Sequence, residues 1–217
     1  MKMIPKRLVL LSLSAAALAA SLSACVPLVV GGAAAGGVLV AMDRRTSGAQ
    51  LEDEGIEMRA ANRIKEALGD GAHINVTSYN RQVLLTGEVA TAQDQKRAEE
   101  VAARVDNVRT VVNDLAVMLP SSLTQRSSDV LITGKVKASL VDAKDVQLNA
   151  FKVFTERGVV YLMGRVTQRE AERATQIARG VANVTKVVRV FEILSEEELA
   201  RLNRQGPTPQ QAPAAPR

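Results

Sequence analysis

The chain of 217 residues contains an internal repeat, and this repeat restricts the possible folds more than any other feature of the sequence. Three pairs of segments match: 63–68 with 135–140, 83–89 with 160–166, and 107–112 with 183–188. Their offsets are 72, 77 and 76 residues, so an insertion and a deletion separate the copies, both at positions expected to be loops. We therefore expect two similar tandem domains, at residues 55–119 and 120–194.

Each copy is predicted to form a helix, two strands, a second helix and a final strand. The apolar spacing at Ala60, Ile64 and Leu68 is typical of a helix with one buried face. In residues 73–79, apolar and polar side chains alternate, as is typical of a half-buried strand. Residues 83–89 are more continuously apolar, which favours the centre of a sheet.

Short turns join the two strands of each copy. We expect a tight turn at Asn80-Arg81, without the usual glycine, and a second at 156–158, where Gly158 suits hairpin chemistry. Gly87 and Gly164 lie near the end of the second strand, and no phosphate-loop pattern follows either. Their expected role is in the backbone: a bulge, or the close approach of a helix.

The predicted fold class is α+β, with two helices on a three-stranded mixed sheet in each domain. The chain has no Trp and only 2% aromatic residues, so its cores must consist of Val, Leu, Ile and Ala. The shortage of aromatic side chains argues against a module that stacks nucleic-acid bases. We therefore expect no nucleic-acid partner.

Residues 1–24 have the organisation of a secretory signal peptide. The start is basic, the apolar run 8–18 is too short to span a bilayer, and small residues complete the segment. Leu22-Ser23-Ala24-Cys25 resembles the lipobox of bacterial lipoproteins. This resemblance implies that cleavage precedes Cys25 and that Cys25 receives a diacylglyceryl group and an N-acyl chain.

Cys25 is the only cysteine, so no internal disulfide can form, and acylation explains why an exported chain keeps one thiol. The alternative is an ordinary signal peptide with an unrelated cysteine. Val26 stands where an aspartate would favour retention at the inner membrane. The expected location is therefore the outer membrane, lipid-anchored and facing the periplasm.

Flanking segments complete the expected organisation. Residues 25–54 are predicted to be a lipid-anchored flexible linker, whose apolar part 26–42 is interrupted by glycines and a proline. A strand packed on the domains is the alternative for 26–42. Residues 195–217 are predicted to be a short helix to about Asn203, followed by a disordered tail rich in Pro, Gln and Ala.

Positive charge gathers in the second copy. Residues 120–194 contain 12 Lys and Arg against 7 Asp and Glu. A basic domain on an exported, acylated protein indicates an anionic phospholipid membrane as its first partner.

The repeat resembles the BON domain (bacterial OsmY and nodulation). The resemblance lies in the strands ending Leu-Thr-Gly87-Glu-Val and Leu-Met-Gly164-Arg-Val, in the charged helix after each, and in Asn-Val-x-x-Val-Val. Two such copies behind a lipobox are similar to the dual BON-domain outer-membrane lipoproteins associated with cell division and envelope stress. The resemblance implies no catalysis, and anionic phospholipid binding through the first helix of the second domain. In the family this helix carries an aromatic residue where this chain has Leu131.

A helical wheel of that first helix separates a buried stripe from an outer face. Ile132, Val136 and Leu140 form the stripe, which we align with Ala60, Ile64 and Leu68. The outer face carries the candidate lipid-binding residues: Val130, Leu131, Gly134, Lys135, Lys137 and Val141. Apolar side chains flanked by lysines are typical of a helix lying at a membrane surface. The alternative is that this face packs on the first domain.

No other residues form a recognisable reactive site. His73 is the only histidine and is expected at a strand start, so we predict no metal site, no cofactor and no Cys/His nucleophile. The pairs Glu99-Glu100 and Glu170/Glu172 are interpreted as solvated helix faces, not as acid/base catalysts. The sequence therefore predicts a non-enzymatic lipoprotein that binds anionic phospholipid and supports envelope integrity. The alternative is a periplasmic scaffold whose domains dock onto outer-membrane assembly or peptidoglycan-remodelling proteins.

Overall fold

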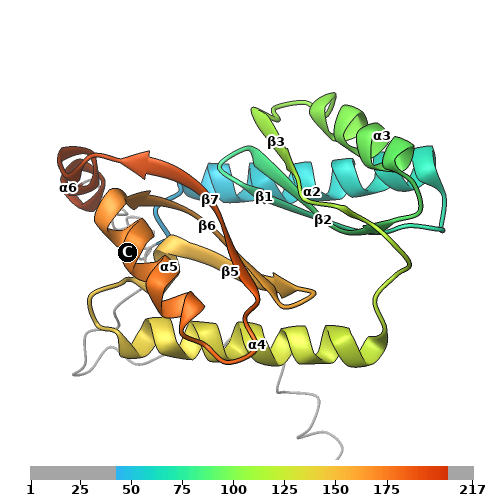
Figure 1. Ribbon diagram of the computed structural model, residues 1–217. Helices are drawn as coiled ribbons and strands as arrows, with labels where there is room; N and C mark the ends of the chain where they lie inside the picture. Colours follow the sequence, from blue (N-terminus) through green and yellow to red (C-terminus); the bar gives the residue numbers. More distant parts are fainter. Residues whose placement is uncertain (1–42, 205–217) are drawn as a thin grey trace, which may run out of the picture. The chain divides into compact units, whose positions relative to one another are not determined.

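The computed structural model describes residues 43–204 (Figure 1). The predicted signal peptide 1–24, Cys25, the segment 26–42 and the predicted tail from residue 205 lie outside the described residues. No helix among residues 43–204 is long and apolar enough to cross a bilayer.

Domain 1 has the predicted order of elements. They are α2 (Ser47–Leu68), β1 (His73–Tyr79), β2 (Gln82–Val89), α3 (Ala92–Ala103), β3 (Thr110–Asn113) and β4 (Ala116–Val117). The final strand, expected to be continuous, is interrupted because Leu115 turns into the core, where it is buried. The Asn113 side chain accepts a hydrogen bond from Leu115 N and so holds the interruption.

Domain 2 repeats this order with a continuous final strand. Its elements are α4 (Leu123–Asp142), the 3-10 turn η2 (Leu148–Ala150), β5 (Phe151–Glu156), β6 (Val159–Thr167), α5 (Gln168–Arg179) and β7 (Lys186–Leu194). The short helix α6 (Glu196–Arg204) follows. Ser195 caps α6 by accepting a hydrogen bond from Glu198 N.

Both sheets are mixed, and the predicted α+β class is confirmed. β2 lies between antiparallel β1 and parallel β3 and β4, and β6 lies between antiparallel β5 and parallel β7. The more continuously apolar strand of each copy is therefore central, as the sequence indicates. In both hairpin turns two residues have the left-handed backbone conformation with a positive φ angle: Asn80 and Arg81 in domain 1, and Arg157 and Gly158 in domain 2.

The boundary expected at Gly55 is wrong, because α2 begins at Ser47. Residues 47–54 look like a polar linker because most of this first part of α2 faces solvent. Thr46 caps the helix by accepting a hydrogen bond from Ala49 N, and Asp53 is already buried.

The two first helices align differently from the expected offset of 72 residues. The buried residues of α2 are Asp53, Ile56, Ala60 and Ile64, and those of α4 are Asp129, Ile132, Val136 and Leu140. Their offset is 76 residues, four more than predicted. A shift of four residues is about one helical turn, so the apolar stripe looks the same in either alignment.

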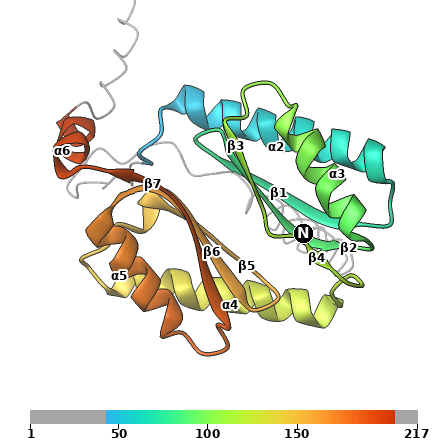
Figure 2. The same ribbon diagram turned by 45° about the horizontal axis from the view of Figure 1, so that its top comes forward.

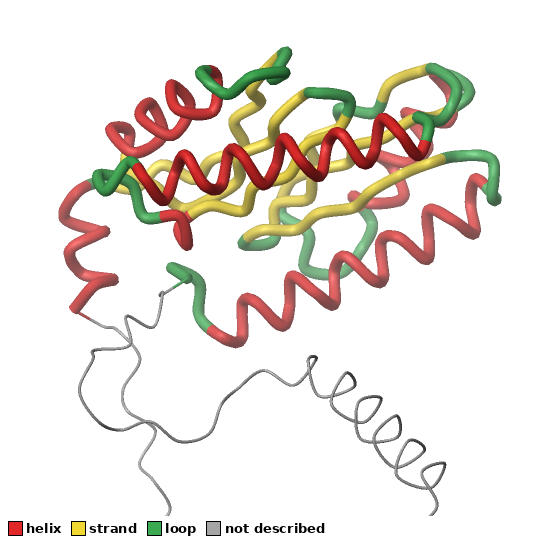
Figure 3. The backbone as a smooth tube through the Cα atoms, turned by 90° about the horizontal axis from the view of Figure 1, so that it is seen from below, coloured by secondary structure: helices red, strands yellow, loops and turns green. Residues whose placement is uncertain are grey.

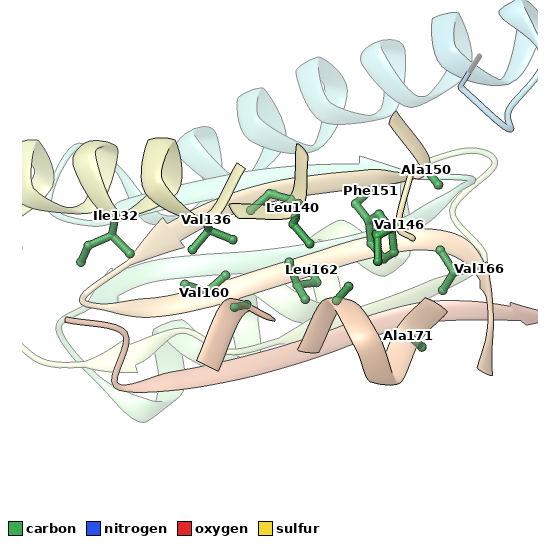
Figure 4. Packing of buried hydrophobic residues seen from close by; sticks show 13 residues of the cluster. Ile132, Val136, Leu140, Val146, Ala150, Phe151, Val160, Leu162, Val166 and Ala171 are labelled. Atoms are coloured by element: carbon green, nitrogen blue, oxygen red, sulfur yellow. The ribbon is translucent and has the colours of Figure 1, made fainter. Parts of the chain in front are cut away.

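Helices cover one face of each sheet, and the other faces meet (Figure 2). In domain 2, Ile132, Val136 and Leu140 of α4 pack against Val160 and Leu162 of β6 (Figure 4). A separate apolar cluster lies between the two sheets, in addition to the core under the helices of each domain. It consists of Tyr79, Leu84, Tyr161, Met163 and Val190. The two domains therefore share a core made by their sheets.

Candidate functional site

The outer face of α4 is exposed. Val130, Leu131 and Val141 are 70%, 66% and 59% accessible. Seen from the side of α4 in Figure 3, this helix lies in front of the strands. The alternative that this face packs on domain 1 is therefore wrong, because the domains meet through their sheets instead.

An uncharged stripe runs along the full length of α4. It contains Leu123, Ser127, Val130, Gly134, Ala138 and Val141, which recur every three or four residues and are all exposed. Leu131 lies beside the stripe, and Lys135 and Lys137 flank it on opposite sides. The structure thus places all six candidate residues of the sequence analysis on the solvent side of one helix.

The start of α4 is fixed by hydrogen bonds. Ser122 and Gln125 form a reciprocal capping box, in which the Ser122 side chain accepts from Gln125 N and the Gln125 side chain accepts from Ser122 N. Just before this cap, Val117, Met118 and Leu119 are exposed apolar residues. They precede the helix in the chain, and no separate role was predicted for them because the final strand of the first copy was expected to extend from Val111 to Leu119.

A groove separates α4 from α5. Its volume is about 540 Å³. Lys135 and Ser139 line it from α4, and Arg173, Gln176 and Ile177 line it from α5. The Arg173 Nε atom donates to Asp145 Oδ2 at 2.8 Å, and both side chains are partly exposed. Basic side chains from both helices therefore stand next to the uncharged stripe.

Each first helix also carries a buried aspartate that holds the hairpin of its own domain. Asp53 accepts hydrogen bonds from Asn80 N and Arg81 N, both at 2.7 Å, and from Ser78 Oγ. Burial raises the pKa of Asp53, but these hydrogen bonds and that from Arg45 outweigh it, so the pKa lies below its ordinary value.

Asp129 does the same in domain 2, where it accepts from Arg157 N and Gly158 N at 2.8 Å. A carboxylate facing two consecutive amides explains why the turn at Asn80-Arg81 forms without glycine. The sequence signal was available: Asp53-x-x-Ile56 and Asp129-x-x-Ile132 repeat at one offset.

Glu170 was expected on a solvated helix face, and this prediction is wrong. Its side chain is buried at the start of α5. Its carboxylate accepts two hydrogen bonds from Arg44, at 2.7 and 2.8 Å, and a third from Thr167 N. Burial raises the pKa of Glu170, yet Arg44 and Thr167 outweigh burial and hold the pKa below its ordinary value. By contrast, Glu99, Glu100 and Glu172 are exposed, as expected.

A polar cluster joins the two domains at the edge of their shared core. His73 starts β1, as predicted, and its Nδ1 atom lies 2.9 Å from Oε2 of the fully buried Glu88. From domain 2, Arg157 donates to Glu88 Oε1 at 3.1 Å. Glu156 is buried beside them and accepts from Asn75 at 2.9 Å.

The two carboxyl groups of this cluster shift in opposite directions. Burial raises the pKa of Glu88, but hydrogen bonds from His73, Ser121 N and Arg157 outweigh burial and lower it below its ordinary value. Burial and the nearby Glu88 charge raise the pKa of Glu156. The cluster is thus an electrostatically unequal pair of acids held between two domains.

Gly87 and Gly164 lie where backbones come close. A Cβ atom at Gly87 would stand 2.0 Å from the carbonyl oxygen of His73, and one at Gly164 would stand 2.3 Å from that of Ala150. For Gly87 the close neighbour is therefore the start of the adjacent strand β1, and for Gly164 it is the end of the 3-10 turn η2 that leads into β5. Gly87 also has a φ of 110°, which side-chain-bearing residues rarely adopt.

Comparison with known proteins identifies the repeat. The profile of the BON domain matches residues 52–118 and 128–195, together more than half of the chain. Each range covers one domain of the structure except for the first turn of its first helix.

Three relatives match over different shares of the chain. The outer membrane lipoprotein DolP of Haemophilus influenzae is 36% identical over 175 residues, which are 80% of this chain and 90% of that protein. A protein named 21 kDa hemolysin, from Actinobacillus pleuropneumoniae, is 36% identical over 69% of this chain and 78% of its own length. The osmotically-inducible protein Y of Escherichia coli is 35% identical over 48% of this chain and 50% of its own.

Proposed function

This chain belongs to the BON domain family as a dual BON-domain outer-membrane lipoprotein, and we propose that it binds anionic phospholipid through the outer face of α4. Its role is envelope-associated and non-enzymatic. We propose further that acyl chains on Cys25 anchor it to the outer membrane on the periplasmic side, and that it supports envelope integrity during cell division and stress.

The observation that carries the proposal is the uncharged stripe on α4. A helix with apolar side chains on one exposed face can insert them shallowly among lipid headgroups. Val130, Leu131 and Val141 provide this face, and apart from the backbone of α4 and the two adjoining residues no atom lies within 4 Å of the position that a Cβ of residue 134 would take. No side chain therefore covers the middle of the stripe.

Charge selects the lipid in this proposal. Lys135 and Lys137 flank the stripe, and Arg173 lies across the groove from Lys135. Each basic side chain near an anionic surface contributes about 1 kcal/mol, so these three give weak binding on their own. The groove between α4 and α5 offers its basic residues to the phosphate of a headgroup while the stripe contacts the acyl region.

The anchor makes weak binding sufficient. Arg44 is hydrogen-bonded to Glu170 of domain 2 and follows Cys25 by 19 residues. The chain between them spans at most roughly 65 Å when fully extended. Within that reach the local lipid concentration is high, so a low intrinsic affinity still keeps α4 on the surface.

A second candidate is a scaffold that docks onto outer-membrane assembly or peptidoglycan-remodelling proteins. The observation in its favour is that Leu51 and Met58 on α2 are 71% and 63% exposed. They lie on the domain that lacks the basic excess, which suits a protein partner better than an anionic membrane.

Vesicle flotation separates the two functions. A fragment of residues 43–204, which contains both cores and no acylation site, should float with vesicles containing phosphatidylglycerol and not with pure phosphatidylcholine. Binding should weaken as salt is raised, because it is partly Coulombic. Leu131→Glu should abolish flotation, because a carboxylate would have to enter the acyl region, and should leave the melting temperature nearly unchanged at this exposed position.

Leu51→Glu is the matched control, because Leu51 is exposed to a similar degree on the first helix of domain 1. It should float like the parent fragment. Unchanged flotation of Leu131→Glu would sink the proposal, and loss of flotation in Leu51→Glu alone would move the lipid contact to domain 1.

A further inference from the structure

The cluster between the domains has the composition of a metal site. One nitrogen or oxygen atom from each of His73, Glu88 and Glu156 lies within 4.8 Å of the others. Two donors come from β1 and β2 of domain 1, and the third comes from the end of β5 in domain 2. An imidazole and two carboxylates are a ligand combination that suits zinc and neighbouring divalent ions.

The spacing of the donors fits coordination. Zinc binds nitrogen and oxygen at about 2.0–2.2 Å, so two ligands of a tetrahedral ion lie about 3.3 Å apart. His73 Nδ1 and Glu88 Oε2 are 2.9 Å apart. If the two atoms moved apart by a few tenths of an ångström, both could bind the same ion. The ring would bind as the neutral tautomer, with its proton on Nε2.

The charges of the cluster favour a cation. Glu88 and Glu156 bring two carboxylates into a buried place, and Arg157 is the one cation in direct contact with either of them among the described residues. Arg157 binds the Oε1 atom of Glu88, whereas the Oε2 atom faces His73 and accepts longer hydrogen bonds from Ser121 N and Oγ. Buried charges that lack a counter-charge are costly, and a divalent ion would supply it.

An ion can also reach the cluster. The side chain of His73 is 23% exposed, whereas that of Glu88 is fully buried. His73 therefore lies at the opening of the cluster and the carboxylates lie behind it. Asn75 and Ser121, which donate to Glu156 and Glu88, hold the two carboxylates in orientation as outer-shell partners do in metal sites.

We propose that His73, Glu88 and Glu156 form a binding site for a divalent transition-metal ion that bridges the two BON domains. Bound there, the ion links β1 and β2 of domain 1 to the β5–β6 turn of domain 2 and so holds the two sheets against each other. The sequence alone predicts no metal site, because the chain has one histidine and one cysteine and these two carboxylates lie 15 and 83 residues from His73.

Zinc titration of the full-length protein in a nonionic detergent tests the site. The chain has a single histidine, so its imidazole nitrogen signals in NMR report on His73 alone. Added zinc chloride should shift the Nδ1 signal and saturate at one ion per chain. In calorimetry, His73→Gln and Glu156→Gln should each weaken zinc binding by at least about tenfold.

Glu172→Gln, a change of an exposed acid on α5, is the matched control and should bind zinc as the parent protein does. The proposal is overturned if excess zinc leaves the ring signals in place, or if His73→Gln and Glu156→Gln bind zinc as tightly as the parent. Should either variant fail to fold, the ring signals of the unaltered protein still decide the question.

Discussion

Domain 1 carries Glu54, Met58, Asn62 and Lys65 along the outer face of α2, whereas domain 2 carries Val130, Gly134, Ala138 and Val141 at the same positions of α4. The buried faces of these helices, by contrast, match position for position: an aspartate is followed by three apolar residues at the same spacing. Duplication thus preserved the part of the helix that holds the sheet. The outer faces differ, because the stripe along α4 has no charged residue and Lys135 and Lys137 stand on either side of it.

The second helices differ in a similar way. In domain 1, Thr91 caps α3 together with Asp94, and this cap is exposed. In domain 2 the equivalent pair, Thr167 and Glu170, is buried under Arg44. The chain arriving from the N-terminal side is therefore bound to the domain that we propose touches the membrane.

The largest loss of stability should follow from replacing the buried aspartate that each domain has on its first helix. Asp53→Ala leaves the amides of Asn80 and Arg81 and the hydroxyl of Ser78 without an acceptor, and should cost about 3 kcal/mol of unfolding free energy. It also removes one of the two carboxylates that Arg45 contacts, while Asp43 remains. Asp129→Ala removes only two backbone hydrogen bonds and should cost about 2 kcal/mol.

Urea denaturation of fragment 43–204 measures both costs. Asn replacements at the two positions are gentler companions, because the amide oxygen can still accept. Equal, small losses for Asp53→Ala and Asp129→Ala would show that the aspartates do not hold the hairpins.

The buried ion pair of domain 2 should give a pH-dependent effect of about 2 kcal/mol. The folded-state pKa of Glu170 lies below its ordinary value of 4.5, so its contribution to stability is present above pH 4.5 and is lost as the pH falls through the folded-state pKa. Melting curves from pH 7 to pH 3 should show this loss. Arg44→Met should remove most of it, whereas Arg97→Met on α3 should leave it intact.

Restoring the charges of domain 1 should weaken lipid binding by at least tenfold, or about 1.4 kcal/mol. The double variant Val130→Glu and Val141→Lys places on α4 the charges that α2 has at Glu54 and Lys65, with no change in net charge. Flotation with anionic vesicles measures the loss. A result like that of the parent would mean that net charge alone, and not the uncharged stripe, drives binding.

The smallest effect should follow from Leu131→Trp. Trp favours the interface between headgroups and acyl chains, so flotation should increase a few-fold, which is under about 1 kcal/mol. Titration with vesicles of fixed composition measures the change. Arg59→Trp, at a position on the side of α2 rather than α4, should not increase binding.

The sequence predicted the strands well because the alternation of apolar and polar residues marks them, as in residues 73–79. It predicted the outer face of α4 because periodicity alone defines that face. It could not set the alignment of the two first helices, since a shift of one turn preserves the apolar stripe.

Contacts between residues that are far apart in the chain could not be predicted from the sequence either. Glu170 resembles any charged residue of a polar helix until Arg44, 126 residues earlier, is seen to cover it. In the same way, Glu156 of domain 2 reaches the cross-strand pair His73 and Glu88 only because the two sheets pack face to face.

The central claim is that domain 2, and not domain 1, presents its first helix to the membrane. The chain offers equivalent exposed positions for a direct measurement: Ala138 on α4 and Asn62 on α2. In fragment 43–204, which lacks the only cysteine, a Cys replacement at either position can carry an environment-sensitive fluorophore. With phosphatidylglycerol vesicles, emission should shift to the blue for Ala138→Cys and stay unchanged for Asn62→Cys. An equal shift at both positions, or a shift at Asn62 alone, would contradict the account.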